Sequence, residues 1–160
     1  MFFKEFDIRW SDLDANRHLA NSAYINFMSH TRMAYLGLLG FNQKSMAQYS
    51  IGPVVFYEHM YYFKEVFPGK PVKVSLDFKG MSEDGMFFEF HHDFYDSNGK
   101  NFARCEMMGA WMDLKERKLI TLPQAFLDAF DKMEKSKEFK TLTKADTRKY
   151  VQVPKDLKTY

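Results

Sequence analysis

Apolar and polar residues follow two different periods along this chain. Across Asn21–Leu39 the apolar residues cover most of the circumference of a helix, which predicts a long helix enclosed by other elements. Gly37 and Gly40 mark its carboxyl end. From Pro53 onward the period changes to two, which is the period of a strand with one buried face.

Turn signals separate the alternating runs. Pro68-Gly69, Asp84-Gly85 and Asn98-Gly99 are typical of tight turns, and the last is a strong hairpin signal. The expected elements are a strand over Phe2–Trp10, the long helix, a short helical turn within Phe41–Tyr49, strands over Val54–Phe67, Lys70–Lys79, Met86–Tyr95 and Phe102–Leu114, and a helix from Pro123 to about Ser136.

This order of elements predicts an α+β fold in which an antiparallel sheet wraps around the long helix. A chain of 160 residues suits a single domain, which we place at residues 1–136. Residues 137–160 then form a carboxyl-terminal tail with some helical character. One sheet layer leaves strand edges and a face uncovered, so we expect a homodimer or a dimer of dimers.

Composition narrows the class of protein. Hydrophobic residues make up 46% of the chain and aromatic residues 18%, which argues against disorder and favours strands. The single Cys excludes an intrachain disulfide, and the charged amino terminus has no signal-peptide core, so we expect a cytoplasmic protein. No apolar run is long enough to predict a membrane span.

The charge balance gives little reason to expect a nucleic-acid partner. Lys and Arg number 23 and Asp and Glu 21, for a net charge of +2. From Lys132 to the end of the chain, basic residues outnumber acidic ones. A solvated terminal helix and tail would explain this excess, and a local attraction for a phosphate-bearing ligand such as coenzyme A is the alternative.

Residues 12–18, Asp-Leu-Asp-Ala-Asn-Arg-His, hold the strongest candidate chemistry. Asp14, Asn16 and His18 alternate here, and the long helix starts directly behind them. The free N–H groups and partial positive charge of a helix start favour a developing oxyanion. A carboxylate, an amide and an imidazole at that position therefore suit thioester cleavage.

Each of these groups has a possible role. Asp14 could attack a carbonyl directly or activate water, and Asn16 could orient water or the substrate carbonyl. His18 could shuttle a proton or orient Asp14. The residues at the start of the long helix would bind the substrate, with backbone N–H groups as the oxyanion site: Asn21, Ser22, Ala23 and Tyr24.

Other readings compete with this one. An Asp-rich loop before a helix is commonly a cap, in which Asn21 or Ser22 would satisfy the free N–H groups. Adjacent His91 and His92 on a strand point to opposite faces, so we expect no metal site. Cys105 lies in an alternating strand and is expected to be a small buried hydrophobe.

The run RWSDLDANRHLANSAYINF, residues 9–27, resembles the opening strand, loop and helix of hotdog-fold thioesterases. Its Asp-x-Asp step is similar to the 4-hydroxybenzoyl-CoA thioesterase family, which implies that Asp14 is the catalytic carboxylate. The fuller Asp-x-Asn-x-His string is similar to acyl-acyl carrier protein thioesterases, which implies roles for Asn16 and His18 as well. In that group a Glu in a later segment also takes part, and Tyr62-Phe63-Lys64-Glu65 points to Glu65.

The resemblance implies a hotdog-fold thioesterase that needs no cofactor and hydrolyses acyl-CoA or acyl-carrier-protein thioesters. Chain length favours the acyl-CoA type and the motif favours the carrier-protein type, so both substrates remain open. Two alternatives also remain. One is a non-catalytic module that binds acyl thioesters or takes part in assembly, and the other is a hotdog dehydratase or hydratase.

Overall fold

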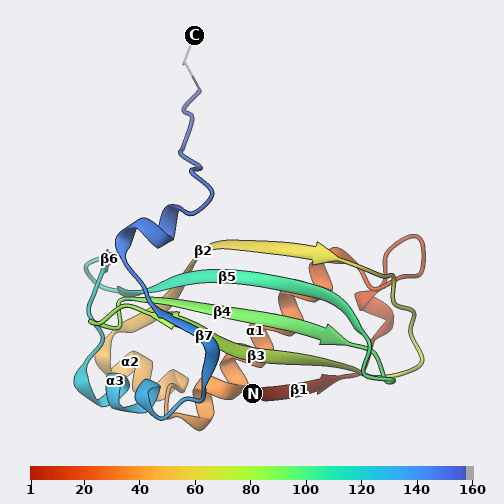
Figure 1. Ribbon diagram of the computed structural model, residues 1–160, viewed down its shortest axis with the longest axis horizontal. Helices are drawn as coiled ribbons and strands as arrows, with labels where there is room; N and C mark the ends of the chain where they lie inside the picture. The colour runs from red at the N-terminus through yellow and green to blue at the C-terminus, as the bar shows by residue number, and fades with distance from the viewer. Residues whose placement is uncertain (158–160) are drawn as a thin grey trace.

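A curled antiparallel sheet wraps around one long helix in the computed structural model, which describes residues 1–157 (Figure 1). This arrangement is the hotdog fold, and the predicted α+β class with a central helix is confirmed. The elements are β1 Phe2–Phe6, a 3₁₀ turn η1 Trp10–Asp12, α1 Asn21–Leu38, α2 Gln43–Tyr49, β2 Ile51–Tyr62, β3 Val72–Met81, β4 Phe87–Tyr95, β5 Asn101–Asp113, β6 Lys118–Leu119, α3 Gln124–Asp131, β7 Lys135–Thr141 and a second 3₁₀ turn η2 Lys144–Arg148.

The main strands lie in the order β1-β3-β4-β5-β2, so β1 and β2 form the two edges. β6 adds to β5, and β7 runs parallel to β3. A bulge at Phe56 shifts the register between β2 and β5, because Val55 pairs with Gly109 while Tyr57 pairs with Met108. Because the bulge adds one residue to β2, the alternation of inward-facing and outward-facing side chains shifts by one residue across it.

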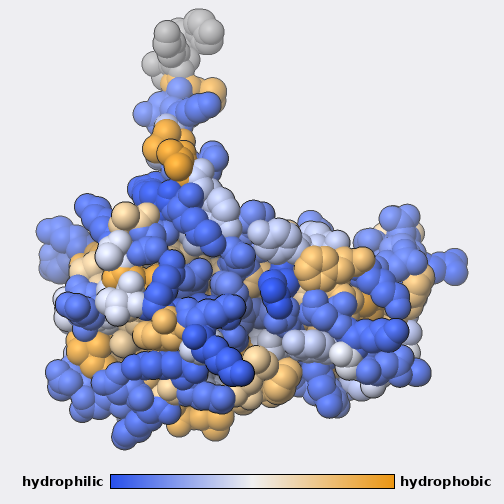
Figure 2. Space-filling view, viewed as in Figure 1, coloured by the Kyte–Doolittle hydropathy of each residue, from blue (hydrophilic) through white to orange (hydrophobic). Residues whose placement is uncertain are grey.

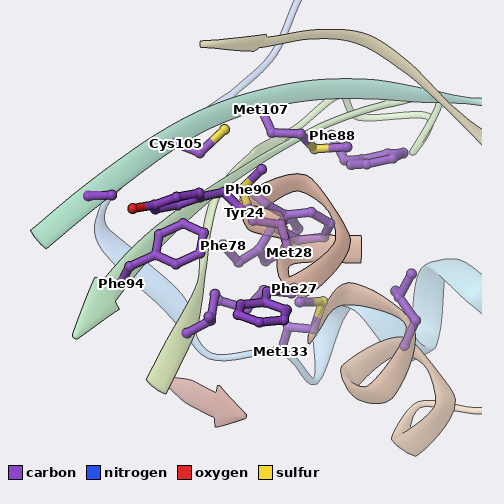
Figure 3. Close-up of a cluster of buried hydrophobic side chains, with 14 of the residues drawn as sticks. Tyr24, Phe27, Met28, Phe78, Phe88, Phe90, Phe94, Cys105, Met107 and Met133 are labelled. Atoms are coloured by element: carbon purple, nitrogen blue, oxygen red, sulfur yellow. The ribbon is translucent and has the colours of Figure 1, made fainter. Parts of the chain in front are cut away.

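The period-two pattern correctly identified the buried face of the sheet. On β3 and β4 the alternating residues that share one face are all buried, and they are Val72, Val74, Leu76, Phe78, Phe88, Phe90, His92 and Phe94. Figure 3 shows Phe88, Phe90 and Met107 of the sheet lying over Tyr24 and Met28 of α1. Burial of each such apolar side chain stabilises the fold by roughly 1.5–3 kcal/mol.

The sheet encloses α1 on one side only. Met28 and Leu36 are buried, whereas Ile25 is 43% exposed and Met33 is 39% exposed. The prediction of an enclosed helix therefore holds for one face of α1 and is wrong for the opposite flank, because a single sheet reaches only one side of a helix.

The predicted first strand ends early, at Phe6 instead of Trp10. The chain turns there because the buried carboxylate of Asp12 accepts a hydrogen bond from the backbone N–H of Arg9 at 2.8 Å. The Arg9 guanidinium also donates to this carboxylate, at 2.8 Å and 3.0 Å. Arg9 holds the pKa of the Asp12 carboxyl below its usual value, so this ion pair stabilises the turn at neutral pH.

The carboxyl-terminal part also differs from the prediction. The helix after Pro123 ends at Asp131 because residues 135–141 instead extend the sheet beside β3, so the expected boundary at residue 137 falls within β7. Glu106 of β5 accepts hydrogen bonds from Lys149 at 2.9 Å and from Tyr150 at 2.7 Å, which holds the segment after η2 against the sheet. Of the predicted tail, residues 158–160 lie outside the described residues.

The outer face of the sheet is largely hydrophilic, as Figure 2 shows. Its polar and charged side chains include Asp77, Lys79, His91, Asp93 and Arg104. Over residues 1–157, no helix is long and apolar enough to cross a membrane.

Candidate active site

Asp14 holds together the loop that precedes α1. Its Oδ1 accepts hydrogen bonds from the backbone N–H groups of Asn16 at 2.8 Å and His18 at 3.0 Å. Arg17 adopts a left-handed backbone conformation, with φ of 64°, to complete this tight turn. Oδ2 of Asp14 accepts no hydrogen bond from any described residue, so one carboxylate oxygen is fixed and the other is available.

A surface cleft of about 410 Å³ brings this loop together with the start of α1 and the segment that follows β2. Residues from all three segments line it, among them Asp14, His18, Asn21, Tyr24, Tyr62 and Glu65. The cleft therefore gathers a carboxylate, an imidazole and a helix start that are separate in the sequence.

His18 is held by two side-chain contacts, one with Glu65 in the cleft and one with Phe67 beside it. Its Nε2 lies 3.2 Å from Oε2 of Glu65, and its ring packs edge-on against Phe67 with the ring centroids 4.8 Å apart. A backbone hydrogen bond from Leu19 to the carbonyl of Val66, at 2.8 Å, ties the two segments together. The imidazole thus has a defined orientation, although Glu65 itself is largely exposed.

The first turn of α1 has no cap from a side chain. Ala20 occupies the cap position, and none of the described side chains accepts a hydrogen bond there, so the helix-cap reading of Asn21 or Ser22 is wrong. The N–H of Ala23 donates to the carbonyl of Ala20 at 2.9 Å. The N–H groups of Asn21 and Ser22 donate to no backbone carbonyl of the described residues, which leaves them free to hold an oxyanion, and of the two residues Asn21 lines the cleft.

Tyr24 places a hydroxyl group at the wall of the cleft. It is buried, and its ring meets Tyr62 edge-on with the centroids 5.1 Å apart. Burial, with smaller contributions from Tyr62 and Asp14, raises the pKa of Tyr24 to about 12. Tyr24 is therefore a neutral hydrogen-bond donor at physiological pH.

The structure separates some of the predicted site residues from the cleft. Asn16 is exposed and does not line it, and its side chain makes no hydrogen bond within residues 1–157. Ser22 and Ala23 do not line the cleft either. Sequence reasoning overlooked Tyr62 and Lys64, which do line it, although the motif that pointed to Glu65 contains both.

Other reactive groups lie elsewhere. Cys105 is fully buried, and burial raises the pKa of its thiol to about 12, so it is not a nucleophile at neutral pH. In the described part of the chain, no three His, Cys, Asp or Glu side chains gather so as to hold a metal ion.

Comparison with known proteins gives a family and several structural relatives. The family model described as the thioesterase-like superfamily matches residues 8–130, and no curated protein matches the chain. A hypothetical protein from Staphylococcus aureus, solved in complex with CoA, has a TM-score of 0.76 and 16% identity, covering 98% of this chain and 95% of its own.

Two further solved structures are named as thioesterases. A DHNA-CoA thioesterase from Staphylococcus aureus has a TM-score of 0.73 and 20% identity, covering 81% of this chain and 88% of its own. A 1,4-dihydroxy-2-naphthoyl-CoA thioesterase from Synechocystis has a TM-score of 0.73 and 15% identity, covering 82% of this chain and 96% of its own. At these identities the similarity is one of fold.

Proposed function

Since the chain belongs to the thioesterase-like superfamily, we propose that it hydrolyses acyl thioesters in the cleft that contains Asp14. One observation carries this proposal. A carboxylate with one available oxygen lines the same cleft as a helix start whose first N–H groups have no side-chain cap. These are the two components that thioester hydrolysis requires, an attacking or activating group and an oxyanion site.

Asp14 acts in one of two ways. Its free oxygen attacks the thioester carbonyl carbon and forms an anhydride that water then hydrolyses, or it takes a proton from a water molecule that attacks instead. In both routes the C–S bond breaks, a C–O bond forms, and the products are a carboxylate and a thiol. The hydrogen bonds to Oδ1 keep the carboxylate in position throughout.

The start of α1 stabilises the negative charge that develops on the carbonyl oxygen. The N–H groups of Asn21 and Ser22, together with the positive end of the helix dipole, serve as donors. One such donor typically contributes about 3–4 kcal/mol to lowering the barrier. The neutral hydroxyl of Tyr24 provides a further donor at the cleft wall.

His18 and Glu65 supply the route for protons. The 3.2 Å contact between them orients the imidazole toward one side of the cleft, where it takes a proton. His18 then delivers that proton to the departing thiolate. Asn16 remains a candidate for orienting water at the rim of the loop.

We favour coenzyme A over acyl carrier protein as the thiol carrier. The CoA-bound relative covers 98% of this chain, so its likeness extends over the carboxyl-terminal segment as well as the core. Lys64 also adds a positive charge to the cleft wall, which suits a carrier that bears phosphates. Acyl carrier protein conjugates belong in the same assay.

A second copy of the chain is the partner we expect along β2. This strand is 12 residues long and lies at the sheet edge, with Val55 48% exposed and Phe56 40% exposed. Unprotected edges of this kind pair readily with another strand. The cleft lies at the carboxyl end of β2, so a paired copy would add to its walls.

The test is thiol release from a panel of acyl-CoAs and acyl carrier protein conjugates. Asp14→Asn should lower kcat by about 10³-fold or more, because an amide neither attacks nor accepts the proton. Glu65→Gln should lower it by about tenfold to a hundredfold through His18. Asp7→Asn, an exposed Asp outside the cleft, is the matched control and should be unaffected.

Turnover by Asp14→Asn equal to that of the parent protein would refute the assignment. Tight binding of acyl-CoA without thiol release at any chain length would instead identify a non-catalytic binding module.

A further inference from the structure

An ion pair lies between α1 and the inner face of the sheet, in a layer that is mostly apolar. Nη2 of Arg32 donates to Oε1 of Glu58 at 3.0 Å and to Oγ of Ser29 at 3.1 Å. The side chains of Arg32 and Glu58 are only 10% and 16% exposed. Replacing a buried ion pair with apolar residues is often neutral or stabilising, so stability alone does not explain this one.

His92 is a further member of this cluster and adds no charge to it. Its Nδ1 lies 2.7 Å from the carbonyl oxygen of Ser75, which can only accept, so Nδ1 carries the proton. Nε2 is then an acceptor and faces Nη1 of Arg32 at 3.4 Å. Burial, with a smaller contribution from Arg32, lowers the pKa of His92 to about 3, so the ring stays neutral.

Some hydrogen-bond donors and acceptors of this cluster have no partner among the described residues. The guanidinium of Arg32 has five N–H groups, and three hydrogen bonds are accounted for. Oε2 of Glu58 accepts no hydrogen bond from residues 1–157. The pair can therefore donate to a ligand and accept from it, which is the pattern that a hydroxyl group satisfies. A carboxylate would fit less well, because it would add an unbalanced negative charge beside Glu58.

An apolar cavity of about 150 Å³ opens beside Arg32. Its walls are formed mainly by Met33, Leu36, Val55, Phe88, Phe90 and Met107, and Ser29 and Arg32 also line it. Figure 3 shows Phe88, Phe90 and Met107 on the sheet side of this layer. An engineered protein cavity of about this volume binds benzene, so the space accommodates about six carbon atoms.

A row of side chains on α1 runs from a residue of the cleft to residues of the cavity. Asn21 lines the cleft, and Ile25, Ser29 and Met33 follow at four-residue intervals, which places them on one face of the helix. Ile25 is 43% exposed, so the row is not covered by the sheet. On β2, Tyr62 lines the cleft, and the alternation leads inward through Met60 to Glu58.

The length of this row determines how far a hydroxyl group on the ligand would lie from the thioester carbonyl. Asn21 and Ser29 are eight residues apart, which corresponds to about 12 Å along the helix axis. An extended chain advances about 1.2 Å per bond, so the distance corresponds to about ten bonds.

We propose that the acyl group of the substrate lies along this row, that Arg32 and Glu58 bind a hydroxyl group about ten bonds from the thioester carbonyl, and that the apolar end fills the cavity. The substrate class is thus a long acyl chain with a mid-chain hydroxyl. This inference rests on the proposed function only for the position of the carbonyl. A chain without the hydroxyl would displace water from the ion pair and return no hydrogen bond, so it binds more weakly.

Binding is measured separately from turnover, so that the two proposals can fail independently. Asp14→Asn protein is titrated by calorimetry with stearoyl-CoA and with stearoyl-CoA that carries a hydroxyl at carbon 12. We expect the hydroxylated ligand to bind at least tenfold more tightly. In an Arg32→Met, Glu58→Leu double variant, which removes both charges with little change in volume, the two ligands should bind within twofold of each other.

Two further variants serve as controls. His59→Gln changes the neighbouring residue of β2, on the opposite face of the sheet, and should keep the tenfold preference. Val55→Phe narrows the cavity, and should weaken binding of the hydroxylated ligand about tenfold while leaving octanoyl-CoA unaffected.

Equal affinity of the Asp14→Asn protein for the two stearoyl ligands, or failure to bind the hydroxylated one, overturns the inference. A preference that survives in the double variant overturns the assignment to Arg32 and Glu58. Thiol release is measured separately, with the parent protein. No thiol release would count against hydrolysis, whereas a preference for the hydroxylated ligand in the binding experiment would still support the hydroxyl site.

Discussion

Because His92 is buried and neutral, we expect the protein to lose stability in mild acid. The side chain lies on the inner face of β4 with no exposed surface, and burial lowers its pKa to about 3 from the ordinary value of 6.5. In the unfolded chain the imidazole takes up a proton as the pH falls through 6.5, whereas in the folded chain it stays neutral until about pH 3. The unfolded state therefore binds more protons in this window, and the free energy of unfolding falls as the pH falls.

The size of the effect follows from the same two pKa values. Each pH unit between them costs about 1.4 kcal/mol, so the fall from pH 6.5 to pH 5 removes about 2 kcal/mol from the free energy of unfolding. Between pH 7 and pH 6.5 the change is small, because the unfolded imidazole is still mostly neutral. A loss of about 2 kcal/mol is a large part of the stability of an ordinary domain.

Urea unfolding at pH 7, 6 and 5 measures this loss directly. His92→Gln keeps a donor and an acceptor but does not titrate, so it should show about 2 kcal/mol less change between pH 7 and pH 5 than the parent protein. His30→Gln, an exposed His on α1, is the matched control and should retain the full change. An identical pH dependence in the parent protein and in His92→Gln would refute the argument.

Two further predictions concern packing and assembly. Gly109→Ala should destabilise the fold by about 1–3 kcal/mol in urea unfolding, because its Cβ would lie 2.6 Å from Cζ of Phe88 and 2.8 Å from the carbonyl oxygen of Val54. Gly37→Ala on α1, where a Cβ meets nothing within 4 Å, should stabilise by about 0.5–1 kcal/mol, and equal effects of the two changes would contradict the packing argument. Phe56→Lys at the β2 edge should shift a dimer toward monomer in sedimentation, and an unchanged dimer would place the interface elsewhere.

Local sequence signals predicted most of the fold because their physical causes are local. The period of two on β3 and β4 identified the buried faces, and the turn at Asn98-Gly99 joins β4 to β5 as expected. The long helix starts at the predicted Asn21 and ends one residue before the predicted Leu39. The same local reasoning misjudged residues 123–141, because β7 exists only where the edge of β3 is available to pair with it.

The sequence by itself determined that Asp14 and His18 would lie just before the start of α1, because a few residues of chain connect them to it. Only the tertiary structure decided that Glu65 reaches His18 and that Glu58 meets Arg32, since these partners are 47 and 26 residues apart along the chain. Such pairs depend on how β2 returns alongside α1, which follows from packing of the whole sheet. No local pattern of apolar and polar residues carries that information.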